Sequence, residues 1–279
     1  NDERAAFSQL SWLEPRVATG SWTLARDFPN LPAWNGRAVG GTALLWTGLT
    51  PRFKAHEFAT RPTYGDVPSA SLENWPLQLA DLEPYYDRAE IEFGTSHRHG
   101  RPPMPANNNY KVFANGAARV GYRHYATGPY ATNTEEYDGR PGTVHDGFSS
   151  QGDKSRSKWT PLVSTIPKAL ATGLLELRTE AQAVHVTLGR DGLADGVVYA
   201  DVHGARHRQR ARVVPIAGNA IETPRLLLLS ANPSHPDGLA NSSGMVGRNY
   251  MRHTTGVVYA QFSDQVNMHR GEPMAGIVN

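Results

Sequence analysis

The 279-residue sequence predicts a mixed fold of class α/β with α+β character, and three observations carry the prediction. A β-branched and apolar stretch leads through small residues into a helical pattern at 211–230, as a strand does when it feeds a helix. Three runs of alternating apolar and polar residues lie between 183 and 214. The first half of the chain contains one clear amphipathic helical pattern, so helices, antiparallel strands and a strand-helix unit are all expected.

The unit at 211–230 is predicted from its local residues. Residues 211–216 favour a strand, Ala217-Gly218-Asn219 favours a turn, and Thr223-Pro224 favours a helix start, because Thr is a good N-cap and Pro fits the first turn. Such a turn places N–H groups and a helix N-terminus where α/β proteins bind anionic cofactors. An ordinary strand-helix unit of a parallel sheet fits the same residues, so both interpretations are open here.

The other elements are predicted from periodicity and from helix-breaking residues. Residues 81–93 predict a helix with Asp81 as its N-cap and Gly94 at its end, and its tyrosines are expected in the core. Residues 127–158 are too polar for the core. The remaining predictions are a short strand at 21–25, a loop at 58–71, helices at 110–120 and 166–172, a strand at 174–178, and a β-meander with strands at 183–188, 196–202 and 206–214.

Bulk properties exclude several classes of protein. A net charge of +2 gives no electrostatic case for binding nucleic acid or an anionic membrane. No apolar run approaches the length that crosses a bilayer. The absence of cysteine excludes disulfides, thiolate nucleophiles and cysteine-held zinc or iron–sulfur sites. The compartment is left open: periplasmic or cytoplasmic, soluble or held at a membrane through a partner.

Two histidines, His97 and His99, lie one residue apart in a polar, proline-rich stretch. Imidazoles at this spacing could ligate a metal, but no third ligand is evident nearby in the sequence. The interpretation as a solvated loop is preferred, and no metal site is predicted.

Three ordered motifs resemble the glucose-methanol-choline (GMC) family of FAD-dependent oxidoreductases. Residues 36–48 are similar to its glycine-rich loop over the flavin, residues 218–230 to its second signature, and residues 245–253 to the segment that follows. Residues 73–90 are most similar to the bacterial gluconate- and glucose-type dehydrogenases. Three matches in order make the resemblance specific, although each alone is weak.

The resemblance implies a Rossmann-like FAD-binding domain that carries the three-stranded meander and is interrupted by segments of a substrate-binding domain. On this reading residues 1–71 and 159–254 are the two parts of the FAD-binding domain. Residues 72–158 are a substrate-domain insert, and residues 255–279 begin the substrate-binding domain proper. The strand at 211–216 would be the last strand of the main sheet.

FAD is the cofactor that the resemblance implies. Glycines in the loop let backbone approach the flavin, although the pair Gly40-Gly41 alone is equally typical of a tight turn. By resemblance, Thr42 brings a hydroxyl beside the flavin, Ala183 meets the adenine through its backbone, and the turn at 218–219 lies near the pyrophosphate. The implied FAD-contacting residues are Arg37, Gly40, Gly41, Thr42, Trp46, Thr47, Gly48, Ala183, Ala217, Gly218 and Asn219.

Two parts of the family pattern are missing. No Gly-x-Gly-x-x-Gly follows a strand, and the C-terminal region with the family's proton-accepting His and its His or Asn partner is not in this sequence. The chain is therefore expected to be a central fragment, and no catalytic residue is assigned within it. His253 matches a position that is not the proton acceptor in the family.

The stretch 144–159 departs from the family pattern. Some relatives carry cysteines there, and certain ones hold an iron–sulfur cluster, whereas this chain has Ser149 and Asp153. Hard oxygen ligands do not support such a cluster. The electron acceptor could be a quinone, a cytochrome, including one on a partner subunit, or oxygen.

The resemblance implies oxidation of a CH–OH group of a sugar, aldonate or other alcohol by hydride transfer to FAD. A different class of function is a non-catalytic GMC-fold remnant or subunit that binds a partner or sugar. A glycan-binding β-rich module is a third, and the strand-helix unit argues against it.

Overall fold

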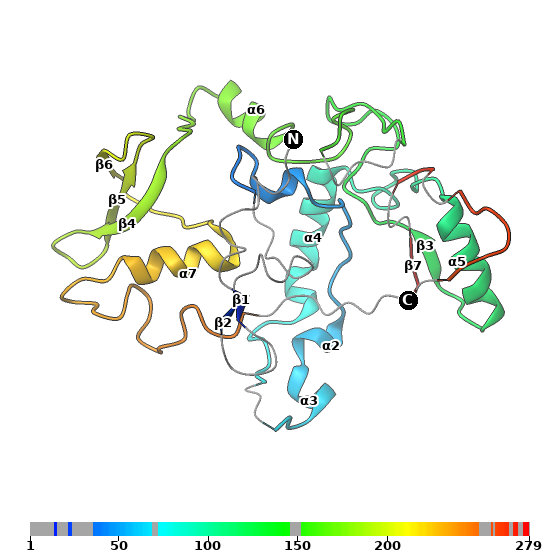
Figure 1. Cartoon of the computed structure of the whole chain (residues 1–279), viewed down its shortest axis with the longest axis horizontal. Helices are drawn as coiled ribbons and strands as arrows, with labels where there is room; N and C mark the ends of the chain where they lie inside the picture. Colours follow the sequence, from blue (N-terminus) through cyan, green and yellow to red (C-terminus); the bar gives the residue numbers. More distant parts are fainter. Residues whose placement is uncertain are drawn as a thin grey trace. The chain divides into compact units, whose positions relative to one another are not determined.

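The computed structural model describes residues 14–15, 22–23, 36–68, 72–145, 152–250, 258, 260–267, 270–272 and 276–278 (Figure 1). The chain forms two compact units. Unit 1 consists of residues 1–175 and 262–279, and unit 2 of residues 176–261. His253 and Ser149 lie outside the described residues.

Helices and strands alternate irregularly along the chain. The elements of unit 1 are β1 (Glu14–Pro15), β2 (Trp22–Thr23), the 3₁₀ turn η3 (Gly41–Leu44), α2 (Ala55–Phe58), α3 (Thr60–Tyr64), α4 (Leu79–Phe93), α5 (Asn108–Arg119), β3 (Tyr125–Thr127), α6 (Thr165–Ala171) and β7 (Gly276–Val278). Those of unit 2 are β4 (Gln182–Leu188), β5 (Ala194–Ala200), β6 (Arg206–Arg210) and α7 (Asn219–Leu229). Among the described helices, none combines the length and apolarity that crossing a bilayer requires.

Helix α4 confirms the strongest helix prediction and corrects its start. The helix begins at Leu79, and Gln78 is the N-cap. Asp81 is the third helical residue, and its carboxylate accepts a hydrogen bond from the Gln78 N–H at 2.8 Å. It stabilises the helix start from inside the helix, as the third residue of a capping box does. Gly94 ends the helix as predicted, but Tyr85 is 62% exposed rather than in the core.

Other predicted elements are partly right. Helices α5 and α6 confirm the predictions within two residues, and β2 confirms part of the predicted strand at 21–25. Helices α2 and α3 lie in and beside the predicted loop at 58–71. The predicted strand at 174–178 is wrong, because no described segment pairs with it and Leu174 is 92% exposed. β-branched and apolar residues favour a strand only where a ladder partner exists.

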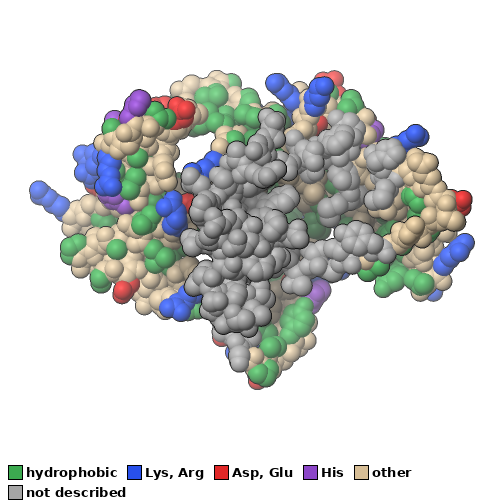
Figure 2. All heavy atoms as spheres, in the orientation of Figure 1, with side chains coloured by type: hydrophobic (Ala, Val, Ile, Leu, Met, Phe, Trp, Pro, Cys, Tyr) green, Lys and Arg blue, Asp and Glu red, His purple; other side chains and the backbone are tan. Residues whose placement is uncertain are grey.

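The β-meander of unit 2 is confirmed. Strands β4, β5 and β6 pair antiparallel in that order, with Val186 opposite Val197 and Val197 opposite Gln209. Strand β6 is shorter than predicted and ends at Arg210, and all five of its residues are exposed. Lys and Arg side chains gather over this meander on the face that Figure 2 shows.

The predicted strand at 211–216 is wrong. The N–H of Ala211 donates to the carbonyl of Asp195 at 3.0 Å, and beyond it the described residues contain no ladder for this stretch. All three sheets among the described residues are antiparallel. The structure therefore supports a mixed helix-and-sheet fold, and the Rossmann-like domain stays a prediction. A parallel strand requires neighbours on the same sheet, and the described residues supply none.

Helix α7 begins four residues before the predicted start at Thr223. Gly218 is at the N-cap position, and the side-chain oxygen of Asn219, the first helical residue, accepts from the N–H groups of Ile221 and Glu222. Asn219 therefore stabilises the helix start in the way that was predicted for Thr223. Thr223 instead accepts the Gly218 N–H. At the other end, the Ser230 hydroxyl accepts the Val186 N–H at 2.9 Å and thereby joins α7 to β4.

The most buried part of unit 1 is polar, which corrects the expectation for residues 127–158. Several of its buried polar side chains are hydrogen-bonded to nearby backbone, which makes their burial tolerable, although the Thr95 and Thr132 hydroxyls are buried without a partner among the described residues. The buried side chains with hydrogen-bonding groups include Tyr130, Thr132, Asn133, Arg140, Ser157 and Lys158, together with Thr95 and Ser96. Composition indicated a surface segment because polarity alone does not reveal which polar groups find partners.

Candidate functional site

The glycine-rich loop at 36–48 folds around the single turn η3. The Gly41 N–H donates to the Ala38 carbonyl at 2.8 Å, and the Leu45 N–H to the Thr42 carbonyl at 2.9 Å. The Gly36 N–H donates to the Thr42 hydroxyl at 3.0 Å, which ties the two ends of the loop together. The loop is thus a defined turn, and the Thr42 hydroxyl has a role within it.

Three segments that are distant in sequence lie side by side next to this loop. Leu49 bridges to Tyr130, and Thr132 bridges to Lys158, both in antiparallel fashion. The Ala131 N–H donates to the Gly48 carbonyl, and the Trp159 N–H to the Ala131 carbonyl, each at 2.7 Å. The end of the glycine loop is therefore fixed to 130–132, and that segment to 158–159.

An aromatic cluster of Trp46, Phe93 and Trp159 packs where the end of the glycine loop meets residues 158–159. The Trp46 indole N–H donates to the Trp159 carbonyl at 3.2 Å. The rings of Phe93 and Trp159 lie 4.3 Å apart between centroids, and Trp46 and Phe93 meet edge to face at 6.2 Å. The indole nitrogen of Trp159 is buried, and it has no hydrogen-bond partner among the described residues. A buried donor without a partner at this position fits a ligand that brings an acceptor.

Lys158 lies beneath the loop with 1% of its surface exposed. Its Nζ donates to the carbonyl of Trp46 at 2.6 Å and to that of Leu44 at 3.2 Å. Burial lowers the pKa of Lys158 to about 8, while the carboxylates of Asp153 and Glu272 act in the opposite direction. A buried ammonium of this kind is tolerated because acceptors surround it.

Asp153 organises the short segment that leads to Lys158. Its carboxylate accepts hydrogen bonds from the Ser155 N–H and hydroxyl, from the Ser157 hydroxyl at 2.8 Å and from the Lys158 N–H. Burial raises the pKa of this carboxyl, but these hydrogen bonds outweigh it and the pKa lies below its usual value. Asp153 thus closes a loop at the position where the resemblance places cysteines in some relatives.

The loop backbone offers room for a flat ligand. A side chain at Gly41, where φ is +60°, would meet nothing within 4 Å, so this stretch of backbone is open on that side. A side chain at Gly40 would instead lie 3.1 Å from Leu44 and 3.2 Å from Leu162. Trp46 and Thr47 are half-buried beside it, whereas Arg37 is exposed. The open backbone and the unpaired Trp159 donor fit a cofactor such as FAD.

The second group of predicted contacts lies in unit 2. Ala183 is half-buried in β4 opposite Tyr199. Ala217 and Asn219 are exposed, and Gly218 is half-buried. The Gly218 N–H and the Asn219 oxygen have partners within the start of α7, and Glu222 brings a carboxylate to the first helical turn. Arg225 pairs with this carboxylate at 2.6 Å. Contact of this turn with pyrophosphate stays a prediction.

A charge cluster that sequence reasoning missed surrounds the buried Glu90. Arg52 approaches Glu90 at 2.5 Å and Asp87 at 2.6 Å, and His99 Nε2 lies 2.8 Å from Glu90. Asp87, Glu90 and His99 have the composition of a metal site, but the guanidinium of Arg52 already supplies the cation between the carboxylates. His99 is therefore a partner of Glu90 rather than part of a solvated loop. The helical spacing of Asp87 and Glu90 was the available signal.

The charge cluster leads to a prediction on pH. Burial raises the pKa of Glu90, but Arg52 and His99 outweigh it, so the pKa lies below the usual 4.5. Its contribution to stability is present above pH 4.5 and is lost as pH falls through the folded-state pKa. Glu90→Gln is expected to lower the free energy of unfolding by about 1 to 2 kcal/mol at pH 7 and to flatten its decline below pH 4.5.

Urea unfolding at pH 7, 4.5 and 3 measures this effect. Glu83→Gln is the matched control, since Glu83 is exposed on the same helix and makes no ion pair with a described residue. A variant at Glu90 that kept the wild-type acid dependence would contradict the assignment.

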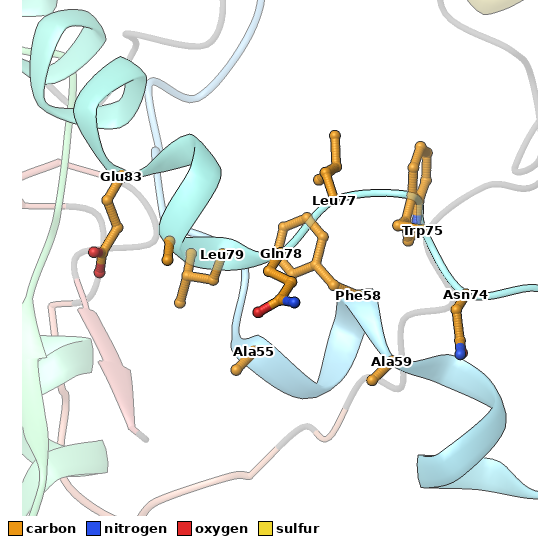
Figure 3. A pocket seen from close by; sticks show the side chains of 10 residues that line it. Ala55, Phe58, Ala59, Asn74, Trp75, Leu77, Gln78, Leu79 and Glu83 are labelled. Atoms are coloured by element: carbon orange, nitrogen blue, oxygen red, sulfur yellow. The ribbon is translucent and has the colours of Figure 1, made fainter.

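A separate pocket of about 530 Å³ lies between α2 and the start of α4 (Figure 3). Phe58 and Gln78 lie near its centre, and Trp75 lies at one end with 62% of its surface exposed. None of its lining residues belongs to the predicted FAD contacts. It has one ionisable lining residue, Glu83, and no cluster of convergent polar groups of the kind that defines a reaction centre.

Comparison with known proteins identifies relatives for most of the chain. A family model described as GMC oxidoreductase matches residues 30–255. The 2-methyl-1,2-propanediol dehydrogenase of Mycolicibacterium austroafricanum is 33% identical over 228 residues, which are 77% of this chain and 40% of that protein. The fructose dehydrogenase large subunit of Gluconobacter japonicus is 29% identical over 78% of this chain and 41% of its own length.

The gluconate 2-dehydrogenase flavoprotein of Pantoea cypripedii is 28% identical over 94% of this chain and 49% of its own length. The chain thus spans less than half the length of these curated relatives. Their names describe dehydrogenases, and one of them names a flavoprotein.

Proposed function

The chain belongs to the GMC oxidoreductase family, and from this premise we propose that it is part of an FAD-dependent oxidoreductase that oxidises a CH–OH group of a sugar, aldonate or other alcohol. The observation that carries the proposal is the glycine loop, whose backbone at Gly41 is open on one side while its far end is fixed to two other segments. A rigid backbone that a flat ring can approach closely is what flavin binding requires of a protein.

Different residues of the loop and its neighbours would contact different parts of the cofactor. The backbone at 40–42 would approach the flavin, and Trp46 and Thr47 would form a wall beside it. The indole N–H of Trp159 would gain the acceptor that it lacks among the described residues. The cofactor would supply the acceptor for the hydride that leaves the alcohol carbon. No described side chain is assigned to accept the hydroxyl proton.

The finer assignments are part of the proposal. Residues 1–71 and 159–254 would form the FAD-binding domain, with 72–158 and 255–279 belonging to the substrate-binding domain. Ala183, Ala217, Gly218 and Asn219 would serve the adenine and pyrophosphate end. A quinone, a cytochrome or oxygen would take the electrons, and a partner subunit carrying the acceptor is consistent with the relatives that are named as a large subunit and a flavoprotein.

The test uses the purified full-length product of the gene that encodes this chain. The protein is mixed with FAD and desalted, and its visible spectrum is recorded before and after anaerobic addition of fructose, gluconate or 2-methyl-1,2-propanediol. Retained flavin bands that bleach with one of these alcohols are expected. Retained flavin that none of several polyols reduces would favour a non-catalytic binding role, and a folded protein that retains none would contradict the proposal.

A further inference from the structure

The side chain of Lys158 joins two parts of unit 1 that are far apart in sequence. It starts from the segment that bridges to Thr132, passes the end of the glycine loop and ends at the carbonyls of Leu44 and Trp46. These carbonyls belong to the last residue of η3 and to the half-buried tryptophan beside it. The ammonium thus holds the loop from within the protein, because Lys158 is buried.

Gly48 supplies an independent observation on the same path. A side-chain carbon at Gly48 would lie 3.5 Å from Cδ and 3.6 Å from Cγ of Lys158, and 3.2 Å from the Thr132 hydroxyl. The methylene chain of Lys158 therefore packs against the one side of Gly48 that a side chain would occupy. The absence of a side chain at Gly48 thus leaves the space in which the Lys158 methylenes pack.

The ammonium has a specific effect on the loop carbonyls. Hydrogen bonds from a charged donor are about twice as strong as neutral ones. Two such bonds fix the orientation of the peptide groups that follow Leu44 and Trp46, and these same peptides carry the N–H groups of Leu45 and Thr47. The bond from Lys158 to the Trp46 carbonyl therefore sets the direction of the Thr47 N–H. Thr47 is one of the proposed flavin contacts, so this orientation bears on flavin binding.

We propose that Lys158 is the positioning residue of the flavin loop, which it holds by donating from its ammonium group to the carbonyls of Leu44 and Trp46. The inference rests on the proposed function in so far as the loop binds flavin. It adds a residue that lies outside the glycine-rich motif and outside every predicted contact. The part that concerns the loop itself is testable without flavin.

The main experiment compares Lys158→Met with Lys154→Met in the full-length gene product. Lys154 lies in the same segment and is exposed, so its variant controls for loss of a lysine. Lys158→Met is expected to raise the FAD dissociation constant at least tenfold and to speed amide hydrogen exchange at residues 41–47 in the flavin-free protein. Lys154→Met is expected to leave both within twofold of the wild type.

A chemical rescue separates the ammonium from the bulk of the side chain. These 279 residues contain no cysteine, so Lys158→Cys adds one thiol to them, and the experiment uses a full-length product in which any cysteine outside them is replaced by serine. Under denaturing conditions the thiol is alkylated either with bromoethylamine, which restores an ammonium at lysine length, or with iodopropane, which restores the length alone. After refolding, slow exchange at 41–47 and flavin affinity are expected to return with the aminoethylated protein and not with the propylated one.

The outcomes are distinct. Equal rescue by both alkylating agents, or a Lys158→Met variant with wild-type exchange at 41–47, would overturn the inference. A wild-type protein that binds no FAD but shows the exchange effect would overturn the proposed function and leave the loop-holding role in place. If Lys158→Met does not fold, Lys158→Gln is measured instead, and an affinity and exchange equal to those of Lys154→Met would count against the inference.

Discussion

Gly48→Ala is expected to lower the free energy of unfolding by about 2 to 4 kcal/mol and to abolish flavin retention. Gly48 is buried with φ at +83°, a left-handed conformation that costs a residue with a side chain about 1 to 2 kcal/mol. The new methyl group would also lie 3.2 Å from the Thr132 hydroxyl, and overpacking of a buried site costs about 1 to 3 kcal/mol. Urea unfolding of the flavin-free protein and desalting after FAD addition measure the two effects.

Gly41→Ala is the matched control for this prediction. Gly41 also has a positive φ, of +60°, but its added methyl would meet nothing within 4 Å. The stability loss is expected to stay near the backbone cost of about 1 to 2 kcal/mol. Flavin affinity should fall nevertheless, because the methyl occupies the space that the flavin is proposed to use. Equal stability losses at Gly41 and Gly48 would show that packing at Gly48 contributes nothing.

Arg140→Met is expected to lower the free energy of unfolding by about 2 to 4 kcal/mol. Arg140 is 2% exposed, and it donates to the Ser157 carbonyl at 2.9 Å and to the Phe93 carbonyl at 2.7 Å. Methionine fills most of the space but removes both hydrogen bonds from the charged guanidinium, and bonds of this kind contribute about 1.5 to 3 kcal/mol each. The Ser157 carbonyl keeps the Asn133 N–H at 3.1 Å, whereas the Phe93 carbonyl loses the Arg140 donor. Methionine also removes the free-energy cost of burying the Arg140 charge, and this offsets part of the loss.

The control is Arg123→Met, because Arg123 is exposed and forms no ion pair with a described residue. Its variant should stay within about 0.5 kcal/mol of the wild type. The measurement is urea unfolding at pH 7, with the same dependence of the unfolding free energy on urea concentration used for all variants. If Arg140→Met matched Arg123→Met, the two carbonyl bonds would have no net stabilising effect. Arg140→Lys should recover only part of the loss, because an ammonium cannot reproduce the planar fork that reaches both carbonyls.

Elements with a local cause were predictable from the sequence. Helix α4 followed from its periodicity and Gly94, and the meander followed from alternation between glycine turns. The family match at 30–255 confirmed the resemblance that the glycine loop and the stretch at 218–230 carried. In each case the residues that decide the structure lie within one short window.

Features that depend on distant partners were not predictable. Residues 211–216 have strand composition but find no ladder among the described residues. Helix α7 starts at Asn219 because its amide oxygen accepts two N–H groups, and this outweighs the preference for a start at Thr223-Pro224. Lys158 looks like any surface lysine in a polar stretch. Its burial depends on carbonyls at Leu44 and Trp46, which no local pattern around residue 158 reveals.

The bridges between the glycine loop and residues 130–132 and 158–159 have a consequence for synthesis on the ribosome. Trp46 and Trp159, which the indole hydrogen bond joins, are 113 residues apart. At about 5 to 20 residues per second, the loop emerges roughly 5 to 20 s before its last supporting segment is made. During that interval Trp46 and its neighbours have none of the contacts to 157–159 that bury them. The nascent chain therefore exposes an aromatic, glycine-rich stretch to chaperones until residue 159 has emerged from the ribosome.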